Sequence, residues 1–311
     1  MSIKVSIIIP VYNKEHSIEK CIKSLLSQSL EDIECVFVDD CSLDKSIELI
    51  KSFSDERIKL ICSPENQGPM CARACGYQAA QGKYIMFCDA DDTIPTDGVQ
   101  KLYEQISLTD SDIVIANYCR VESDGSTHVV KNTFPFGKDK IGVFKGLLSW
   151  SQSQSLCDKI FNCRLFSEDL VALKGQRNGE DGWLLYQLID RSNRIDVVDA
   201  VVYNYVMDDS STTHQRYSKE ALERVVKSNI ARANIACKYK ECEALASRHL
   251  IINKYRWLEA GYDKQFINHL LQKNKVASSL VSVQSLFRNF SLLEIVKLYC
   301  KTTIKRYYAK R

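Results

Sequence analysis

We predict an α/β fold with a doubly wound, mostly parallel sheet for this chain of 311 residues. Strand-like and helix-like segments alternate through the first 120 residues, at the spacing of parallel strands joined by right-handed crossover helices. Acidic residues directly follow several strand-like segments, and open α/β sheets hold their ligands at the carboxyl ends of their strands. Beyond residue 217 the pattern is helical almost to the end. A ligand-binding sheet followed by a helical C-terminal extension is therefore the expected architecture.

Each predicted strand is a short apolar run that stops at a polar or turn-forming residue. In chain order these runs are Val5–Pro10, Ile33–Val38, Ile58–Cys62, Tyr84–Cys88 and Asp112–Cys119. Helices are predicted between them from apolar residues at helical spacing or from a capping residue. The predicted helices are Ser17–Leu26, Asp44–Ile50, Met70–Ala80 and Asp97–Ile106. Later residues are less regular: 149–155 is Ser/Gln-rich and expected to be an exposed loop, while 197–206 is expected to be extended.

The composition is that of a soluble globular protein, with 45% hydrophobic and 26% charged residues. The 13 cysteines form no C-x-x-C pair, and several lie inside apolar runs. They are therefore expected to be free thiols in a reducing compartment rather than a disulfide framework or a zinc site. No signal peptide and no apolar run of about 18 residues is visible, so a cytoplasmic location is expected.

Charge divides the chain into an acidic body and a basic C-terminal region. Residues 1–214 hold 22 Lys+Arg and 32 Asp+Glu, whereas residues 215–311 hold 20 and 7, which gives net charges of −10 and +13. We predict one domain over 1–215 and a helical region over 216–311. The segment 294–311 mixes basic and aromatic residues, as helices on anionic membranes do, which would place the protein at the inner face of the plasma membrane. A solvated helix that covers the core is the alternative, and nucleic acid is not an expected partner.

A cluster of acids at 89–92 is the most informative feature of the sequence. The apolar run Tyr84–Cys88 ends in three carboxylates within four residues, Asp89, Asp91 and Asp92. Their mutual repulsion is relieved if a cation or a donor-rich ligand binds between them. A hard divalent ion held by one or two carboxylates and by substrate phosphates meets that need. A solvated loop that caps the next helix is the alternative.

Two further strand ends present polar side chains to the same predicted edge. Pro10 ends the first strand and Tyr12 follows it, while Asp39 and Asp40 follow the second strand. Tyr12 is placed to stack on a base and Asp40 to accept hydrogen bonds from it, while Arg73 on the following helix faces a base or phosphate. Together these residues predict a pocket for a nucleotide diphosphate with a divalent cation. Neither a G-x-x-x-x-G-K-[ST] loop nor a G-x-G-x-x-G motif is present, which argues against triphosphatases and dinucleotide enzymes.

A second acidic pair, Glu180 and Asp181, opens the helix-like segment after Gly179. Carboxylates are favoured at a helix N-terminus by the macrodipole, which is the structural interpretation. The functional interpretation is a general base, since a carboxylate near a reacting hydroxyl can accept its proton as the new bond forms.

Four sequence blocks carry a family resemblance. They are VSIIIPVYN, VDDCSLDKS, ENQGPMCARACGYQAAQGKYIMFCDADD and GED. In this order and spacing they resemble the family 2 inverting nucleotide-sugar glycosyltransferases of the GT-A fold, densely over residues 3–119 and more thinly through residue 215. The resemblance implies that 1–119 is the nucleotide-sugar-binding half of the domain and 120–215 the acceptor-side half.

Carried over residue by residue, the resemblance implies roles for these side chains. Asp181 corresponds to the catalytic base, and the neighbouring Glu180 is expected to bind the nucleotide sugar. Asp91 corresponds to the metal ligand of a D-x-D motif, and Asp89 to a contact with the ribose or a metal-bound water. The residues expected to bind the nucleotide are Pro10, Tyr12, Asp39, Asp40 and Arg73.

The implied activity is transfer of a sugar, with inversion, from a nucleotide diphosphate sugar to a hydroxyl acceptor. The implied cofactor is Mn²⁺ or Mg²⁺, the donor a UDP-sugar, and the acceptor a saccharide or lipid-linked saccharide in surface polysaccharide or lipopolysaccharide synthesis. The sequence lacks the Q-x-x-R-W motif and the transmembrane helices of processive members, so one transfer per binding event is expected.

Two residues have weaker assignments. Some GT-A enzymes use a late histidine on the metal or diphosphate, and His214 is the candidate here, although a lone histidine in a polar loop is commonly just solvated. Lys159 lies where family members often show a similar K-[IL]-[FY] segment, and packing beneath the acceptor loop is its alternative role.

Two other classes of protein are alternatives, one because it has a similar sheet and the other because it also clusters acids at strand ends. A sugar-phosphate nucleotidyltransferase would open with a Gly-rich loop after the first strand, whereas this chain has Pro10-Val11-Tyr12-Asn13-Lys14 there. A phospho-acceptor signalling module is near 120 residues long, so the remaining 190 or so residues would have to form an effector. Both alternatives are less favoured than glycosyl transfer.

Overall fold

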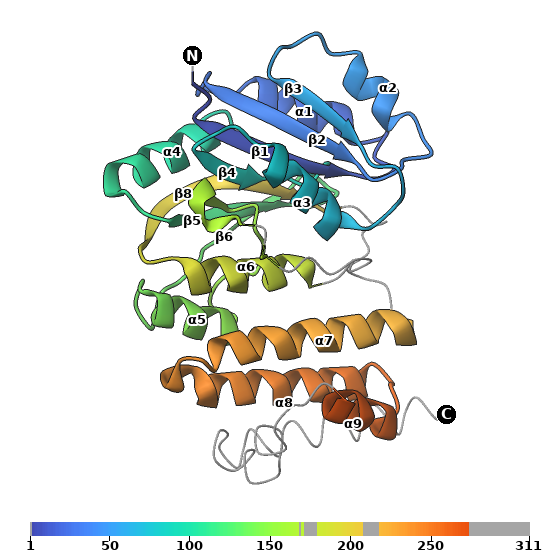
Figure 1. Ribbon diagram of the computed structural model, residues 1–311, viewed down its shortest axis with the longest axis vertical. Coiled ribbons are helices and arrows are strands. Elements are labelled where there is room, and N and C mark those ends of the chain that lie inside the picture. The colour runs from blue at the N-terminus through green and yellow to red at the C-terminus, as the bar shows by residue number, and fades with distance from the viewer. Residues whose placement is uncertain (1, 168, 171–178, 208–217, 274–311) are drawn as a thin grey trace.

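The computed structural model describes residues 2–167, 169–170, 179–207 and 218–273. Within these residues, one end of the molecule is a central sheet with helices on both faces, and the other end is a stack of helices (Figure 1). The helix α6 (Glu180–Arg191) lies between the two, with the sheet on one side and the C-terminal helices on the other (Figure 1). The predicted α/β architecture with a helical extension is therefore confirmed.

The first half of the sheet is parallel. Its elements in chain order are β1 (Val5–Val11), α1 (Ile18–Leu26), β2 (Ile33–Asp39), α2 (Ser46–Lys51), β3 (Ile58–Cys62), α3 (Pro69–Ala79) and β4 (Tyr84–Phe87). The strands lie in the order β3-β2-β1-β4. Every predicted strand and helix of this half is present, with ends that differ by a residue or two. The carboxyl ends of these four strands meet at one edge of the sheet.

The second half of the sheet is mixed. Its elements are α4 (Gly98–Thr109), β5 (Ile113–Val121), β6 (Thr127–Val130), α5 (Lys140–Leu148), β7 (Lys159–Asn162) and β8 (Ile195–Val206). The strand β7 inserts between β4 and β5 and is antiparallel to both, while β8 pairs in parallel with the other side of β5. The sheet is thus mostly parallel, as predicted, but β5 does not pair directly with β4.

Successive strand residues face opposite sides of the sheet, and helices cover both sides. Ile8 of β1 and Val38 of β2 face α3. They pack against Gly76 so closely that a Cβ added at residue 76 would overlap the Ile8 side chain. On the other side, Cys88 meets Cys21 of α1, with the two Sγ atoms 3.9 Å apart. All 12 cysteines among the described residues are free thiols, as expected.

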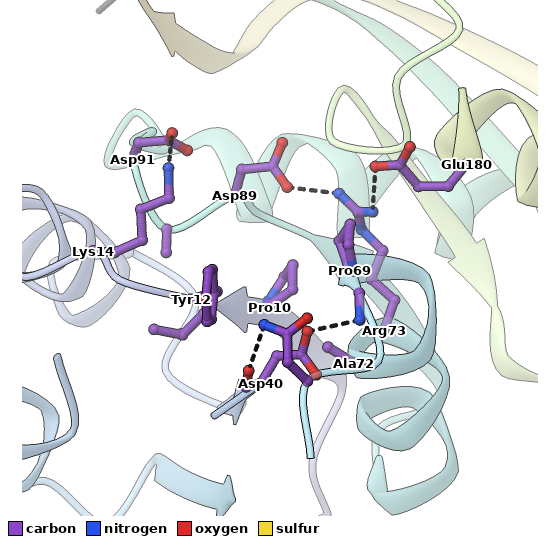
Figure 2. A pocket seen from close by; sticks show the side chains of 14 residues that line it. Pro10, Tyr12, Lys14, Asp40, Pro69, Ala72, Arg73, Asp89, Asp91 and Glu180 are labelled. Carbon is purple, nitrogen blue, oxygen red and sulfur yellow. Dashed lines mark hydrogen bonds and ion pairs between the residues drawn. The ribbon is translucent and has the colours of Figure 1, made fainter. Parts of the chain in front are cut away.

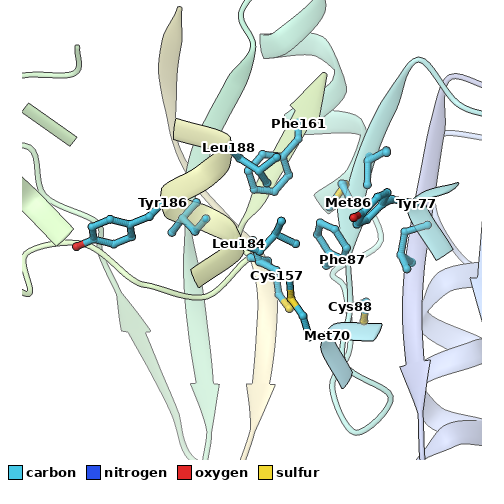
Figure 3. Close-up of a cluster of buried hydrophobic side chains, with 14 of the residues drawn as sticks. Met70, Tyr77, Met86, Phe87, Cys88, Cys157, Phe161, Leu184, Tyr186 and Leu188 are labelled. Atoms are coloured by element: carbon cyan, nitrogen blue, oxygen red, sulfur yellow. The ribbon is translucent and has the colours of Figure 1, made fainter. Parts of the chain in front are cut away.

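Helix α6 packs its apolar side on the second half of the sheet. Leu184 and Leu188 point toward the ring cluster that contains Phe87 and Phe161, and Tyr186 points away from the sheet (Figure 3). The ring of Tyr186 instead packs on Phe144 of α5, with ring centroids 5.4 Å apart. The first turn of α6 is therefore fixed relative to the sheet by packing on both sides of the helix.

The C-terminal helices continue the same core. They are α7 (Lys219–Ala236), α8 (Glu243–Glu259) and α9 (Lys264–Lys273). Buried residues of α7 and α8, such as Val226 and Leu250, belong to the apolar cluster that also contains the sheet strands. None of the described helices is both long and apolar enough to cross a membrane.

The loop 149–155 differs from its prediction. It is a loop, but Gln152 is buried rather than exposed. Gly146 of α5 makes this possible, because a Cβ there would overlap the Gln152 amide. The loop therefore folds onto α5 and becomes part of the wall beside α6.

Candidate functional site

A pocket of about 290 Å³ opens at the carboxyl edge of β1, β2 and β4 and is bounded by α3 and the start of α6. Its lining comes from the strand ends predicted to converge and from the first turns of the two helices (Figure 2). The lining residues are Pro10, Val11, Tyr12, Lys14, Asp40, Asn66, Gly68, Pro69, Ala72, Arg73, Asp89, Ala90, Asp91 and Glu180.

The two loops that follow β1 and β2 are locked together beside this pocket. Asn13 and Cys41 both adopt left-handed backbone conformations, with φ of 51° and 64°. The side chain of Asn13 accepts a hydrogen bond from the Leu43 N–H at 2.8 Å, and its N–H donates to the Ser42 hydroxyl at 3.0 Å. A left-handed conformation is strained for a residue such as cysteine, and strain of this kind often accompanies functional loops.

Asp40 and Asp39 have different surroundings. The Asp40 carboxylate accepts hydrogen bonds from the N–H groups of Gln67 and Gly68, at 2.8 and 2.7 Å, and lines the pocket. Its oxygens retain lone pairs for a further donor. Asp39 is not among the lining residues, and its carboxylate accepts the Ser42 N–H at 3.1 Å. Asp39 therefore shapes the loop, and its contact with the nucleotide stays a prediction.

Tyr12 and Pro10 lie on the β1 side of the pocket, and Pro69 and Ala72 of α3 lie across from them (Figure 2). Tyr12 is 37% exposed, although it directly follows the buried residue Val11. A flat ligand can therefore stack on its face without displacing core residues.

Arg73 is the electrostatic centre of the site. Its guanidinium contacts Asp89 at 2.7 Å, Asp181 at 2.8 Å and Glu180 at 3.5 Å (Figure 2 shows the contacts to Asp89 and Glu180). Arg73 itself is buried. One buried cation thus joins the acids after β4 to the acids that open α6, two segments that are about 90 residues apart. The sequence analysis assigned Arg73 to the nucleotide and did not predict its contacts with Glu180 and Asp181.

The clustered charges shift each other's titration. Burial raises the pKa of Asp181 to about 7, and Arg73 opposes that rise. Burial also raises the pKa of Glu180, again against the effect of Arg73. Although burial disfavours the charge on Arg73, the carboxylates of Asp181, Asp89 and Glu180 raise its pKa above the ordinary value. Asp181 is not among the lining residues itself but contacts Arg73, which is one of them. A carboxyl group with a pKa near neutral beside a pocket is suited to proton transfer.

Asp91 is paired with a residue that sequence reasoning missed. The ammonium of Lys14, in the loop after β1, forms an ion pair with the Asp91 carboxylate (Figure 2). Burial disfavours the Lys14 charge, but Asp91 raises the pKa of Lys14 above its ordinary value. The position of Lys14 directly after the Val11-Tyr12-Asn13 turn was the available signal. The Asp91 side chain is still 38% exposed, so its second oxygen is open to solvent or ligand.

Asp92, the third acid of the cluster, is a structural residue. Its carboxylate accepts hydrogen bonds from the Tyr203 hydroxyl at 2.5 Å and the Val206 N–H at 2.7 Å, and it is buried. The Tyr203 hydroxyl in turn accepts the N–H of Asp89 at 3.1 Å. Burial raises the pKa of Asp92 well above its ordinary value. Asp92 thus ties the end of β4 to β8 and fixes the direction of Asp89.

Lys159 packs beneath the loop that borders α6. Its side chain is 0% exposed, and its ammonium contacts Asp158 at 2.6 Å and donates to the carbonyls of Ser155 at 2.7 Å and Ser153 at 3.1 Å. These contacts agree with the alternative role of Lys159, which is to pack beneath the acceptor loop. His214 and the segment 294–311 lie outside the described residues.

The donor set fits a divalent cation that takes most of its ligands from elsewhere. Among the described residues, no group of three His, Cys, Asp or Glu side chains is arranged to hold a metal. Asp91 offers one exposed carboxylate to the pocket, and the Lys14 ammonium beside it marks a position that attracts positive charge. One carboxylate completed by phosphate oxygens and water is an ordinary magnesium arrangement.

Comparison with known proteins gives a consistent result. The model of Glycosyl transferase family 2 matches residues 6–171, which are 166 of the 311 residues. The Glycosyltransferase GlyA of Streptococcus pneumoniae is 33% identical over 214 residues, which are 65% of this chain and 30% of GlyA. The putative glycosyltransferase EpsH of Bacillus subtilis is 29% identical over 227 residues, which are 70% of this chain and 65% of EpsH. The aligned stretches span 30–43% of the first three curated relatives.

The fold also matches a solved structure over nearly its whole length. The crystal structure of S. aureus TarS 1–349 in complex with UDP superposes with a TM-score of 0.68, at 18% sequence identity. The superposition covers 99% of this chain and 91% of the TarS chain. This likeness confirms the predicted GT-A fold.

Proposed function

The chain belongs to Glycosyl transferase family 2, and we propose that it transfers a sugar, with inversion, from a nucleotide diphosphate sugar to a hydroxyl acceptor. One observation carries the proposal: Arg73 joins Asp89 and Glu180 of the pocket lining to Asp181, a carboxyl group whose pKa is raised by burial to about 7. Such a group accepts protons efficiently at the pH of a cell.

The nucleotide half of the donor fits the β1–α3 side of the pocket. Tyr12 offers an exposed ring for a base, and Asp40 offers lone pairs to a base N–H. Uracil is the proposed base because TarS, which has the same fold, has been crystallised with UDP and with UDP-GlcNAc. Lys14 and Arg73 supply positive charge on opposite sides of the acids, where a diphosphate would otherwise be repelled.

A divalent cation, Mn²⁺ or Mg²⁺, is proposed beside Asp91. Asp91 would hold the ion, Asp89 would contact the ribose or a metal-bound water, and His214 is a further candidate ligand from its position in the sequence. When bound, the ion neutralises the charge that develops on the leaving diphosphate. Lys14 must share or release Asp91 for this to occur, because its ammonium contacts the same carboxylate.

Asp181 is the proposed general base. In its deprotonated form it accepts the proton of the acceptor hydroxyl while that oxygen attacks the anomeric carbon and the bond to the nucleotide diphosphate breaks on the opposite face. Positive charge builds on the sugar ring in such displacements. Glu180 and Asp89 contact the Arg73 guanidinium and would keep it in place during the reaction.

A role in bacterial surface-polysaccharide synthesis is proposed from the relatives. They include a succinoglycan biosynthesis protein of Rhizobium meliloti and a putative teichuronic acid glycosyltransferase of Bacillus subtilis, which align over 39% of this chain each. The acceptor is then a saccharide or lipid-linked saccharide. Contact of the basic segment 294–311 with an anionic membrane stays a prediction from sequence.

A screen of nucleotide sugars tests the proposal. With Mn²⁺ or Mg²⁺ present, one donor should be turned over with release of a nucleoside diphosphate, and Asp181→Asn should reduce that turnover. Release of pyrophosphate from a nucleoside triphosphate and a sugar phosphate would instead identify a nucleotidyltransferase, which family membership does not favour. Labelling by acetyl phosphate would identify a phospho-acceptor module.

A further inference from the structure

The turn that carries Asp181 is held from the side opposite the pocket. Its residues, Gly179 to Gly182, form the N-cap and first turn of α6, and Arg73 contacts them from the pocket side. Helix α7 lies along the other side of α6 (Figure 1). The matched family region ends at residue 171, so α7 belongs to the part of the chain that the family model does not describe.

Ser228 of α7 makes the first contact with this turn. Its hydroxyl donates a hydrogen bond to the Gly179 carbonyl at 2.8 Å. That carbonyl also accepts the N–H of Trp183 at 3.2 Å, which closes the first turn of α6. Gly179 has a positive φ of 76°, which favours glycine at this position. The hydrogen bond from Ser228 therefore fixes the peptide orientation just where the chain enters the helix.

Arg232, one helical turn further along α7, makes the second contact. Its guanidinium lies against Gly182, where an added Cβ would overlap Nη1, and it donates to the side chain of Gln154. The guanidinium carbon is also 5.9 Å from the ring centroid of Tyr186, the residue of α6 that points away from the sheet in Figure 3. Arg232 thus touches the first two turns of α6 and the loop that is anchored by Lys159.

The stability of the fold gives little reason for a charged side chain at position 232, between α6 and α7. Arg232 is buried, and among the described residues its Nε has no hydrogen-bond partner. Burial lowers the pKa of Arg232, while Tyr186 and Glu180 favour its charged form. Burying a charge without full pairing is unfavourable for folding, so a well-packed apolar residue would serve the helix interface as well or better.

We propose that Ser228 and Arg232 are positioning residues for Asp181. They fix the first turn of α6 from behind, so that the Asp181 carboxylate stays in contact with Arg73 beside the pocket. The inference rests on the proposed function of Asp181 as general base. A base that shifts by about 1 Å loses on the order of 10²-fold in rate, although the groups that bind the donor are unchanged. The residues proposed to bind the base, Tyr12 and Asp40, follow β1 and β2, whereas the hydrogen bonds of Ser228 and Arg232 go to Gly179 and to Gln154.

The test uses the full chain with Arg232→Met, Arg232→Lys and Ser228→Ala. Arg224→Met is the matched control, because Arg224 is an exposed arginine of the same helix. Turnover is measured with the donor found in the screen, and UDP affinity by calorimetry. We expect Arg232→Met to lower kcat by about 10- to 100-fold while UDP affinity stays within about twofold. Ser228→Ala should show a smaller loss of the same kind, and Arg232→Lys should recover part of the rate.

Hydrogen exchange of the peptide that contains Glu180–Trp183 gives a second readout that needs no activity. Exchange there should be about tenfold faster in Arg232→Met than in the wild type, and unchanged in Arg224→Met. Wild-type kcat together with wild-type exchange in Arg232→Met overturns the inference. Equal losses of kcat and UDP affinity also overturn it, since they indicate general unfolding. If the wild type transfers no sugar from any donor, the proposed function fails, and the exchange experiment still decides whether α7 fixes the turn.

Discussion

The raised pKa of Asp181 predicts how activity depends on pH. With a pKa of about 7, the carboxylate form that can accept a proton makes up about 1/11 of the enzyme at pH 6 and about 10/11 at pH 8. The value of kcat/KM, which reports the free enzyme, should therefore rise about tenfold between these pH values. An aspartate with an ordinary pKa would be deprotonated throughout, and the rate would not change.

The assay is release of nucleoside diphosphate across pH 5 to 9 at saturating divalent ion. Asp181→Asn should lower turnover by about 10²-fold or more and leave donor binding nearly intact, and its residual rate should lose the acidic limb. Asp190→Asn, at the far end of the same helix, is the control and should keep the limb. A flat profile in the wild type, or an acidic limb that persists in Asp181→Asn, would refute the assignment of Asp181 as base.

Three further predictions concern the metal and the core. Asp91→Ala should abolish the gain in UDP affinity that Mn²⁺ provides; calorimetry that shows the same gain would remove Asp91 from the metal site. Lys159→Ala leaves the buried Asp158 without its cation and should lower the free energy of unfolding by about 3–5 kcal/mol, and a loss under 1 kcal/mol in denaturant titration would contradict the described contacts. Gly76→Ala forces a Cβ into Ile8 and should cost about 1–3 kcal/mol in the same titration, whereas an unchanged midpoint would show that α3 can move away.

Sequence reasoning located the pocket because it needs only the ends of strands. Apolar runs predicted β1, β2 and β4, and parallel pairing brings their carboxyl ends to one edge. It could not predict that β7 inserts between β4 and β5, since that pairing joins segments about 75 residues apart in the chain and leaves no local pattern.

Side-chain direction limited the assignment of individual acids. Two acids that are adjacent in the sequence at a strand end can point in different directions, and the sequence does not tell which of them lines a pocket. Asp40 lines the pocket while Asp39 caps a turn, and Asp91 lines it while Asp92 anchors β8. The contribution of Lys14 was missed because a lysine in a loop is ordinarily solvated, and only the fold brings it to Asp91.

The central claim is that the pocket at the carboxyl edge of the sheet holds a nucleotide diphosphate beside Asp91 and Arg73. A crystal structure of the complex with UDP and Mn²⁺ tests it most directly, with anomalous scattering to locate the manganese. The account predicts the uracil on Tyr12, the diphosphate near Arg73 and the manganese bound to Asp91. Both ligands bound at a different surface, with the Lys14–Asp91 ion pair still intact, would contradict it.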